Sequence, residues 1–222
     1  YQIIGYKWLR SLAEYNLGGI LADDMGLGKT LQSIVYIKSI KDLDEDEKFL
    51  VVCPSSLVYN WKDEIETFAP DLNSTIIIGS PEERENIIKT DIDTDVWITS
   101  YPLIRRDYQL YEDINFNTVF IDEAQNIKNP NSMNSKSVKL LNCKHRFAIT
   151  GTPIENTLTE LWSIFDFIMP DYLSNHNKFT KEIEKPILKG DEDALDDLNK
   201  RIQPFVLRRM KQDVLKELPD KI

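Results

Sequence analysis

The sequence predicts an α/β fold with a doubly wound, mostly parallel sheet, followed by a C-terminal helical protrusion. Short, almost continuously apolar runs recur between residues 19 and 150, and segments with helical spacing separate them. Continuous apolar runs are typical of strands that are buried on both faces. The expected strands are residues 19–22, 49–53, 75–78, 96–99, 118–121 and 146–150. Regular alternation of strands and helices implies parallel strands joined by right-handed crossovers.

The pattern changes after Pro170. Charged, helix-favouring segments replace the apolar runs, and we expect no strand over residues 171–218. Residues 1–170 are therefore expected to form the sheet domain, and residues 171–222 a helical protrusion that starts a linker. The chain begins within an expected helix and ends shortly after Pro219, so we expect it to be a piece of a longer protein.

The acidic residues are concentrated in two short runs. The formal net charge is −10, from 37 acids and 27 bases, and residues 42–47 and 191–197 each hold five acids and no base. Without these ten acids the rest of the chain is neutral. Such runs are typical of solvated loops and helix faces. By charge alone, we expect this chain to bind DNA weakly.

Composition argues against a membrane span and a zinc site. No stretch approaches the ~18 uninterrupted apolar residues that a membrane helix needs. Cys53 and Cys143 lack the spacing of metal ligands, and only His145 and His176 add imidazole. Two such cysteines are typical of reduced thiols, and we expect a cytoplasmic or nucleoid protein, or a nuclear one in a eukaryote.

Residues 23–30 (DDMGLGKT) have the composition of a phosphate-binding loop. They follow an apolar strand and precede a helical pattern, which is the context that such a loop requires. Gly26 and Gly28 allow the backbone to approach phosphate oxygens, Lys29 is placed to reach the β and γ phosphates, and Thr30 to bind Mg²⁺. The common pattern has glycine where Asp23 stands. The alternative is a glycine-rich turn before a helix, which the Gly-Lys-Thr ending disfavours.

A pair of acids ends the strand at residues 118–121. Asp122 therefore lies at the carboxyl edge of the sheet, where doubly wound folds bind ligands. We expect Asp122 to hold Mg²⁺ and Glu123 to orient the attacking water. Taken alone, the pair is equally compatible with an acidic N-cap of the next helix. Together with the phosphate loop, it favours a nucleotide triphosphate site.

Further motifs occur in a fixed order along the chain. They include Asp-Glu-Ala-Gln at residues 122–125, Thr-Gly-Thr-Pro at 150–153 and Thr-Ser-Tyr at 99–101. Their sequences and order closely resemble those of the Swi/Snf-type ATPases, DNA translocases of the superfamily-two helicase group. That family's phosphate loop begins with Asp, which accounts for Asp23. Residues 1–9, 53–61, 161–170 and 205–218 also resemble family sequence, so the resemblance covers nearly the whole chain.

This resemblance implies the first RecA-like lobe of a two-lobed motor that uses ATP and Mg²⁺. Residues that match the family's nucleotide-contacting positions are Gln2, Asp24, Met25, Gly26, Leu27, Gly28, Lys29 and Thr30. Those that would sense the γ-phosphate and couple it to lobe motion are Gln125, Thr150, Gly151 and Thr152. The DNA-contacting candidates are Ser55, Trp61, Lys62, Ser100 and Tyr101.

Two of these assignments leave alternatives open. Trp61 stands at helical spacing, so a place in the core is about as good an expectation as base stacking. Arg208, Arg209 and Lys211 form a basic cluster near the end of the chain. It fits a solvated helix face as well as a contact with DNA or with the second lobe.

The function expected from these motifs is ATP-driven translocation on double-stranded DNA that remodels protein–DNA complexes. The expected partners are duplex DNA, a second RecA-like lobe of the same polypeptide and a DNA-bound protein. That second lobe would supply arginine fingers, which are worth about 10³–10⁵ in rate, so this lobe alone should hydrolyse ATP poorly. The alternatives are a nucleotide-gated binding module without turnover and an RNA-directed helicase of the same superfamily.

Overall fold

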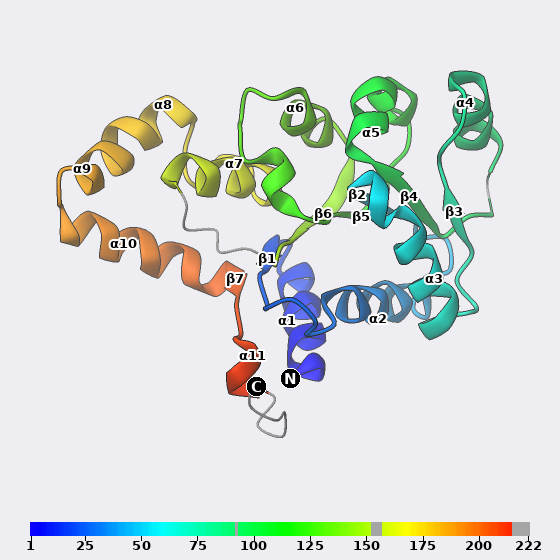
Figure 1. Ribbon diagram of the computed structural model, residues 1–222, viewed down its shortest axis with the longest axis horizontal. Coiled ribbons are helices and arrows are strands. Elements are labelled where there is room, and N and C mark those ends of the chain that lie inside the picture. Colours follow the sequence, from blue (N-terminus) through cyan, green and yellow to red (C-terminus); the bar gives the residue numbers. More distant parts are fainter. Residues whose placement is uncertain (92, 152–156, 215–222) are drawn as a thin grey trace, which may run out of the picture.

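The computed structural model of the chain describes residues 1–91, 93–151 and 157–214. These residues form a seven-stranded sheet in the order β3-β4-β2-β5-β6-β1-β7, and all its strand pairs are parallel (Figure 1). The strands are β1 (Gly19–Leu21), β2 (Phe49–Cys53), β3 (Ser74–Ile76), β4 (Val96–Ser100), β5 (Phe116–Ile121), β6 (Cys143–Ile149) and β7 (Val206–Leu207). The predicted fold class is confirmed.

Helices cover both faces of the sheet. On one face lie α1 (Gln2–Glu14), α2 (Lys29–Lys41) and α3 (Val58–Phe68), as Figure 1 shows below the sheet. On the other lie α4 (Pro81–Thr90), α5 (Tyr101–Asp107), α6 (Met133–Lys139) and α7 (Leu158–Ile168). This is the doubly wound arrangement, in which the carboxyl ends of the strands form one common edge.

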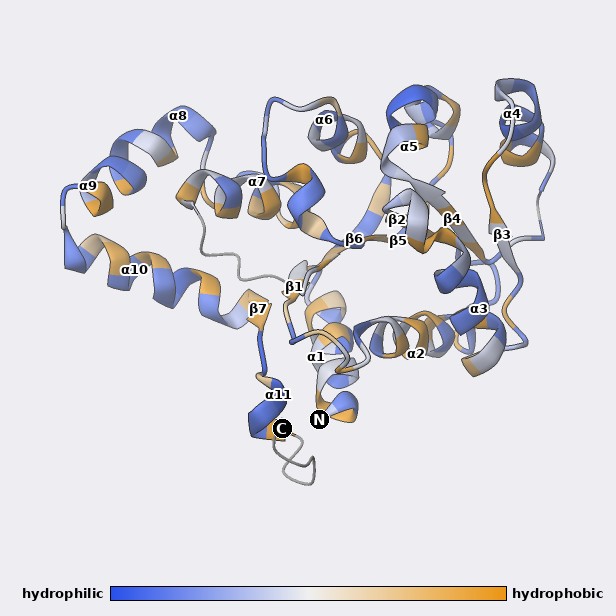
Figure 2. Ribbon diagram, in the orientation of Figure 1, coloured by the Kyte–Doolittle hydropathy of each residue, from blue (hydrophilic) through white to orange (hydrophobic). Residues whose placement is uncertain are grey.

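The core lies around the central strands. All residues of β2, β4 and β5 are buried, which explains why their sequences are apolar without alternation. Figure 2 shows the hydrophobic residues along the strands and on the sides of the helices that face them. The rings of Tyr36, Phe120 and Phe147 pack against one another, with centroids 5.4–5.7 Å apart, and this contact joins α2 to β5 and β6.

Local sequence signals set several helix starts. The Ser80 hydroxyl accepts from the Glu83 amide while the Glu83 carboxylate accepts from the Ser80 amide, and Pro81 occupies the first helical position of α4. Thr157 caps α7 and Asp191 caps α10 (Glu192–Ile202) through their side chains. Each cap satisfies backbone N–H groups that the first turn of a helix leaves without a partner.

The expectation of no strand after residue 170 is wrong. The strand β7 pairs in parallel with β1, with Ile20 opposite Val206 and Leu21 opposite Leu207. Two residues are too short to show periodicity, and a long-range pairing of this kind leaves no local signal. The chain thus leaves the sheet as a helical protrusion and returns to its edge.

The protrusion itself is helical, as expected. It contains α8 (His176–Phe179), a π-helical turn over Thr180–Glu184, α9 (Lys185–Leu188) and α10, and it extends to one side of the sheet (Figure 1). After β7, the short helix α11 (Lys211–Val214) lies beside the start of the chain. Among the described residues, no helix has the length and apolar character to span a membrane.

Candidate functional site

The phosphate loop connects β1 to α2 at the carboxyl edge of the sheet. Gly26 and Gly28 have φ values of 83° and 69°, in the left-handed region that favours glycine, and Gly28 is the N-cap of α2. The loop therefore presents the amino end of α2 to whatever binds there, as in anion sites at helix N-termini. The helix begins at Lys29, followed by Thr30, as the sequence predicts.

Lys29 is half-buried and held back against the loop. Its Nζ donates to the carbonyl oxygens of Asp23 (2.7 Å) and Asp24 (3.2 Å). Burial lowers the pKa of the Lys29 ammonium, while the negative charges of Asp23, Asp122 and Glu123 act in the opposite direction. The predicted lysine and the predicted acid pair therefore share one electrostatic environment, although they follow β1 and β5 in the chain and β6 separates these two strands.

Gln2 lies against the same loop from α1. A Cβ atom at Gly28 would lie only 2.5 Å from Gln2 Nε2, so the second glycine permits this approach. Likewise, a Cβ atom at Gly151 would lie 3.0 Å from Met25 Cγ and 3.5 Å from Lys29 Nζ. Gln2, near the start of the chain, and Gly151, shortly after β6, thus both lie against the phosphate loop.

Asp122 is 8% exposed and is held by two donors. The indole Nε1 of Trp61 donates to Oδ2 (2.9 Å), and the Glu123 amide donates to Oδ1 (2.8 Å). Burial raises the pKa of the Asp122 carboxyl, and these two hydrogen bonds partly offset the rise. A desolvated carboxylate with so few protein partners is well suited to a bound cation.

The turn after Asp122 links the acid pair to the end of β6. Glu123 has φ 51° and ψ 60°, a left-handed conformation that is uncommon for a residue with a side chain. Gln125 Nε2 donates to Glu123 Oε2 (2.7 Å), and the Thr150 hydroxyl donates to Gln125 Oε1 (3.2 Å). The predicted coupling residues Gln125 and Thr150 are therefore in contact, while Thr152 lies outside the described residues.

The five DNA candidates divide into two groups. Ser55 is exposed and Lys62 is partly exposed, so both are accessible to a nucleic acid. Trp61, Ser100 and Tyr101 are only 1%, 2% and 1% exposed. The core alternative for Trp61 is confirmed. The Tyr101 hydroxyl donates to the Asp122 carbonyl (2.8 Å), so both aromatic residues support the acidic turn, and burial disfavours contact between their side chains and DNA.

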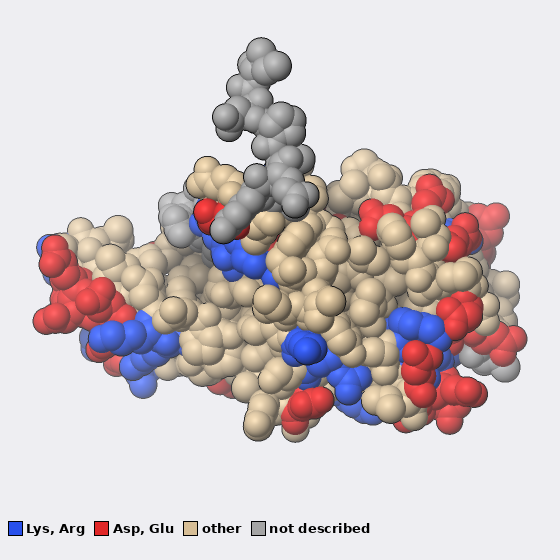
Figure 3. Space-filling view, turned by 90° about the horizontal axis from the view of Figure 1, so that it is seen from below, with Lys and Arg blue, Asp and Glu red and all other residues tan. Residues whose placement is uncertain are grey.

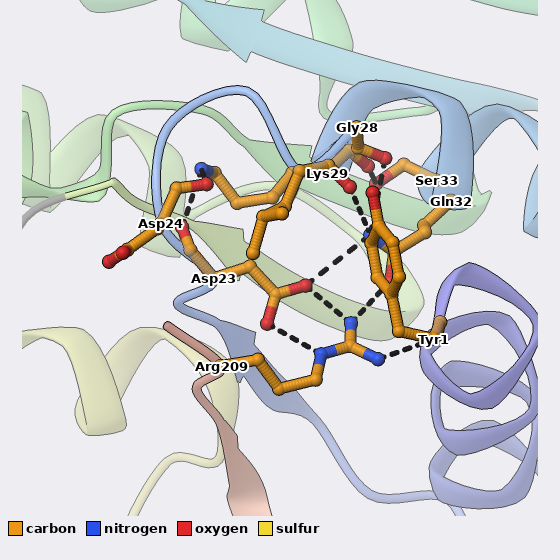
Figure 4. A network of polar contacts seen from close by, with 9 residues as sticks. Tyr1, Asp23, Asp24, Gly28, Lys29, Gln32, Ser33 and Arg209 are labelled. Atoms are coloured by element: carbon orange, nitrogen blue, oxygen red, sulfur yellow. Dashed lines mark hydrogen bonds and ion pairs between the residues drawn. The ribbon is translucent and has the colours of Figure 1, made fainter. Parts of the chain in front are cut away.

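Arg209 is the contact that pattern analysis missed. Its guanidinium pairs with the carboxylate of Asp23, which is 0% exposed, across 186 positions of sequence (Figure 4). The sequence leaves a solvated helix face, DNA and a second lobe as surroundings for the basic cluster, and this ion pair adds a fourth, the phosphate loop itself. The available signals were an acid where the common phosphate motif has glycine and a basic cluster near the end of the chain, but no local pattern connects the two.

The donor set fits Mg²⁺ better than a transition metal. The described residues hold no group of three or more His, Cys, Asp or Glu side chains that would bind a metal. Magnesium is usually held by one or two carboxylates, phosphates and several waters, all of them oxygen ligands. Thr30 and Asp122, the predicted magnesium ligands, supply a hydroxyl and a carboxylate of this kind.

Comparison with known proteins gives a consistent result over the whole chain. The SNF2-related domain model matches residues 1–222. The chain is 39% identical over 246 residues to TATA-binding protein-associated factor mot1 of Aspergillus fumigatus, all of this chain and 13% of that protein. It is 43% identical over 227 residues to an ATP-dependent helicase of Mycoplasma pneumoniae, all of this chain and 21% of that protein.

The fold agrees with the same family. A solved structure of the Sulfolobus solfataricus SWI2/SNF2 ATPase core in complex with double-stranded DNA matches with a TM-score of 0.91 and 42% identity. The match covers all of this chain and 47% of the archaeal one, so the chain spans only part of each of these relatives. Sequence and fold agree, and the chain belongs to the SNF2-related domain family.

Proposed function

We propose that this chain is the ATP-binding lobe of a DNA-dependent ATPase that translocates on double-stranded DNA and remodels protein–DNA complexes. The observation that carries the proposal is the convergence of Lys29 with Asp122 and Glu123 at one edge of the sheet. Phosphoryl transfer to water depends on positioning and charge stabilisation, which an ammonium, backbone N–H groups and a magnesium-binding carboxylate provide.

Each predicted residue has a distinct task under this proposal. Lys29 would exchange the carbonyls of Asp23 and Asp24 for the β and γ phosphates of ATP. Thr30 and Asp122 would hold Mg²⁺, which supplies charge neutralisation at the phosphates. Glu123 would orient the attacking water, and Gln2, which already lies against the loop, would contact the adenine edge.

After hydrolysis, a conformational change at Glu123 would be transmitted to the end of β6. The hydrogen-bonded series Glu123, Gln125 and Thr150 connects the carboxylate proposed to orient water to Thr150, the residue that follows β6. A change in the position of Glu123 when the γ-phosphate leaves would therefore be transmitted to that strand end. A second lobe of the same polypeptide would complete the site with arginine fingers, worth about 10³–10⁵ in rate.

Duplex DNA is the proposed track, and Ser55 and Lys62 are the residues of this lobe proposed to contact it. The support comes from the archaeal relative, whose structure is a complex with double-stranded DNA. On the face seen in Figure 3, most acidic side chains gather toward the two ends, and several basic side chains lie between them. Such a motor would work where DNA lies, in a nucleoid or a nucleus, on a DNA-bound protein.

The decisive experiment is the steady-state ATPase rate of the full-length protein that contains this chain. It should be measured without nucleic acid, with duplex DNA and with RNA, beside a Glu123→Gln control. We expect strong stimulation by duplex DNA that the control abolishes. Stimulation by RNA alone would favour the RNA-directed helicase, and ATP binding without stimulation would favour the nucleotide-gated binding module.

A further inference from the structure

Asp23 holds a carboxylate that the proposed phosphate chemistry does not use. Its side chain is 0% exposed and therefore cannot reach a bound phosphate or the solvent. A buried carboxylate needs a partner of opposite charge, because desolvation of an unpaired charge costs several kcal/mol. In this chain the partner comes from residue 209, at the far end of the described residues.

Arg209 is fixed in its position by five contacts. Its Nε donates to Asp23 Oδ1 (2.9 Å) and its Nη2 to Asp23 Oδ2, so the pair is bidentate (Figure 4). The same Nη2 donates to Gln32 Oε1 (2.8 Å), and Nη1 donates to the Tyr1 carbonyl (2.5 Å). The guanidinium carbon also lies 5.4 Å from the centre of the Tyr1 ring. A planar guanidinium with this many partners permits one geometry only.

Backbone hydrogen bonds join the same two segments. The amide of Ala22 donates to the Leu207 carbonyl (2.7 Å), and the amide of Asp24 donates to the Arg209 carbonyl (3.0 Å). The amide of Lys211 donates to Asp24 Oδ2 (2.9 Å). We call residues 206–214 the return segment, because they bring the chain back from the helical protrusion to the phosphate loop. The return segment thus extends the parallel pairing of β1 and β7 into the loop itself.

The phosphate-binding lysine is attached to the same two residues. Lys29 Nζ donates to the carbonyls of Asp23 and Asp24, whose carboxylates and amide hold the return segment. A phosphate in the loop competes with these carbonyls for the ammonium. Any adjustment of Asp23 and Asp24 that follows acts directly on Arg209 and Lys211, because these residues are hydrogen-bonded to one another without an intermediate.

Stability alone does not account for such a pair. Replacing a buried ion pair by apolar residues of similar volume is often neutral or stabilising, whereas a bidentate pair fixes one register between two segments. Gly5 provides a further sign of a fixed geometry, since a Cβ atom there would lie 1.7 Å from Gln32 Oε1 and 2.9 Å from Arg209 Nη2. Only glycine at this position in α1 leaves room for the network.

We propose that Arg209 is a positioning residue that couples nucleotide binding in the phosphate loop to the return segment. The inference rests on the proposed function only in requiring that the loop bind ATP. It adds a route by which the nucleotide acts on the part of the chain that follows the protrusion, separate from the Glu123–Gln125–Thr150 route. Arg209 touches neither reacting atoms nor phosphate and acts through Asp23.

Amide hydrogen exchange of the full-length protein tests the coupling, with and without MgATP in an enzyme stopped by Glu123→Gln. The reporters are the amides of Ala22, Asp24 and Lys211, which cross between the two segments, and those of residues 26–30 for nucleotide binding itself. We expect MgATP to slow amide exchange at both sets. At the crossing amides the exchange rate should fall by about 5- to 150-fold.

The variants separate coupling from folding. Arg209→Gln should keep slower exchange at residues 26–30 on MgATP binding and lose it at Lys211. Arg209→Lys keeps the positive charge but cannot make the bidentate contact with Asp23. It should therefore also lose most of the coupling. Arg208→Gln changes the adjacent arginine and should behave as the parent does.

Two results would overturn the inference, and they can be told apart from failure of the proposed function. Unchanged exchange at the crossing amides of the parent, with slower exchange at residues 26–30, would refute the coupling alone. Coupling that persists fully in both Arg209 variants would refute the role of this residue. If MgATP changes exchange nowhere in the loop, the proposed ATP site fails and the inference fails with it.

Discussion

The phosphate loop and the acidic turn stand on the same edge of the same sheet, yet the chain supports them in opposite ways. The loop is held by residues from the two ends of the described chain, with Arg209 on Asp23 and Gln2 beside Gly28. The turn is held by residues nearer in sequence, with Trp61 from α3 and Tyr101 from α5 on Asp122. Both arrangements fix a charged group that burial disfavours, Lys29 in one and Asp122 in the other.

This difference separates two kinds of positioning. The turn depends on side chains that belong to the core of the sheet domain, so it is as rigid as that core. The loop depends on a segment that reaches it only after the helical protrusion, so its rigidity depends on that return. We therefore expect the loop to respond to events elsewhere in the chain, and Asp122, which the core residues Trp61 and Tyr101 hold, to keep its position.

The largest effect should follow from removing the charge that holds the loop. Asp23→Asn leaves the Arg209 guanidinium, 14% exposed, without its carboxylate, and we expect the free energy of unfolding to fall by about 3–5 kcal/mol. Chemical denaturation of the purified protein measures it. The double variant Asp23→Asn/Arg209→Met should recover much of the loss. A single-variant loss below about 1 kcal/mol would mean that the return segment does not support the loop.

A smaller effect is expected when the acidic turn loses one of its donors. Trp61→Phe keeps most of the ring volume but removes the hydrogen bond to Asp122 Oδ2, and we expect ATP hydrolysis to fall by about 10- to 100-fold. The matched control is Trp162→Phe, which removes a comparable indole hydrogen bond, to the Ser174 carbonyl instead of to Asp122. Equal losses in the two variants would assign the effect to general destabilisation.

The position of the candidate site at the carboxyl edge of the sheet could be predicted from local sequence, whereas the residues that support it could not. Lys29, Asp122 and Glu123 follow strands at the carboxyl edge, and six strands were located because buried strands have a continuous apolar pattern. An aromatic side chain at position 61 or 101 is suited both to stacking on a base and to holding an acid. Only tertiary packing decides between these roles. The pairing of Arg209 with Asp23 spans 186 positions, and β7 is two residues long, so neither leaves a periodic signal.

Strand and helix ends were also set by tertiary contacts. The strand expected at residues 75–78 is β3 (Ser74–Ile76), and the one expected at residues 118–121 begins at Phe116. The serines at 55 and 56, which resemble an N-cap, instead lie in a single 3₁₀ turn before α3, without a side-chain cap. Pairing with a neighbouring strand and packing under the sheet override local preference at such ends.

Helix α3 carries one residue that supports the acidic turn and one that is proposed to contact DNA. A substitution of the second should have a smaller effect. Trp61 points into the core and Lys62 toward solvent, where it pairs with Glu66 at 3.6 Å. We expect Lys62→Ala to weaken duplex binding by a few-fold and to reduce the slope of log affinity against log salt by about 1. Fluorescence anisotropy at several salt concentrations measures both. An unchanged slope would remove Lys62 from the DNA-contacting residues.

The smallest effect concerns the protonation of Asp122 itself. Burial holds the pKa of this carboxyl above its ordinary value of 3.8, so its proton should leave at a higher pH than those of exposed aspartates. Its contribution to stability is then complete below pH 3.8 and is lost as the pH rises through the raised pKa, because the folded state binds the proton more tightly than the unfolded one. The Glu123 amide, which donates to Oδ1, reports the titration by NMR.

The same NMR titration tests how Trp61 supports the acidic turn. The Trp61 hydrogen bond stabilises the ionised carboxylate, so Trp61→Phe should move the titration of the Glu123 amide to a still higher pH. Asp122→Asn should abolish the transition and so assign it. A transition at or below pH 3.8 in the parent protein would show that burial does not dominate the pKa of Asp122. The acidic turn would then be no more rigidly enclosed than the loop, and the contrast between the two supports would fail.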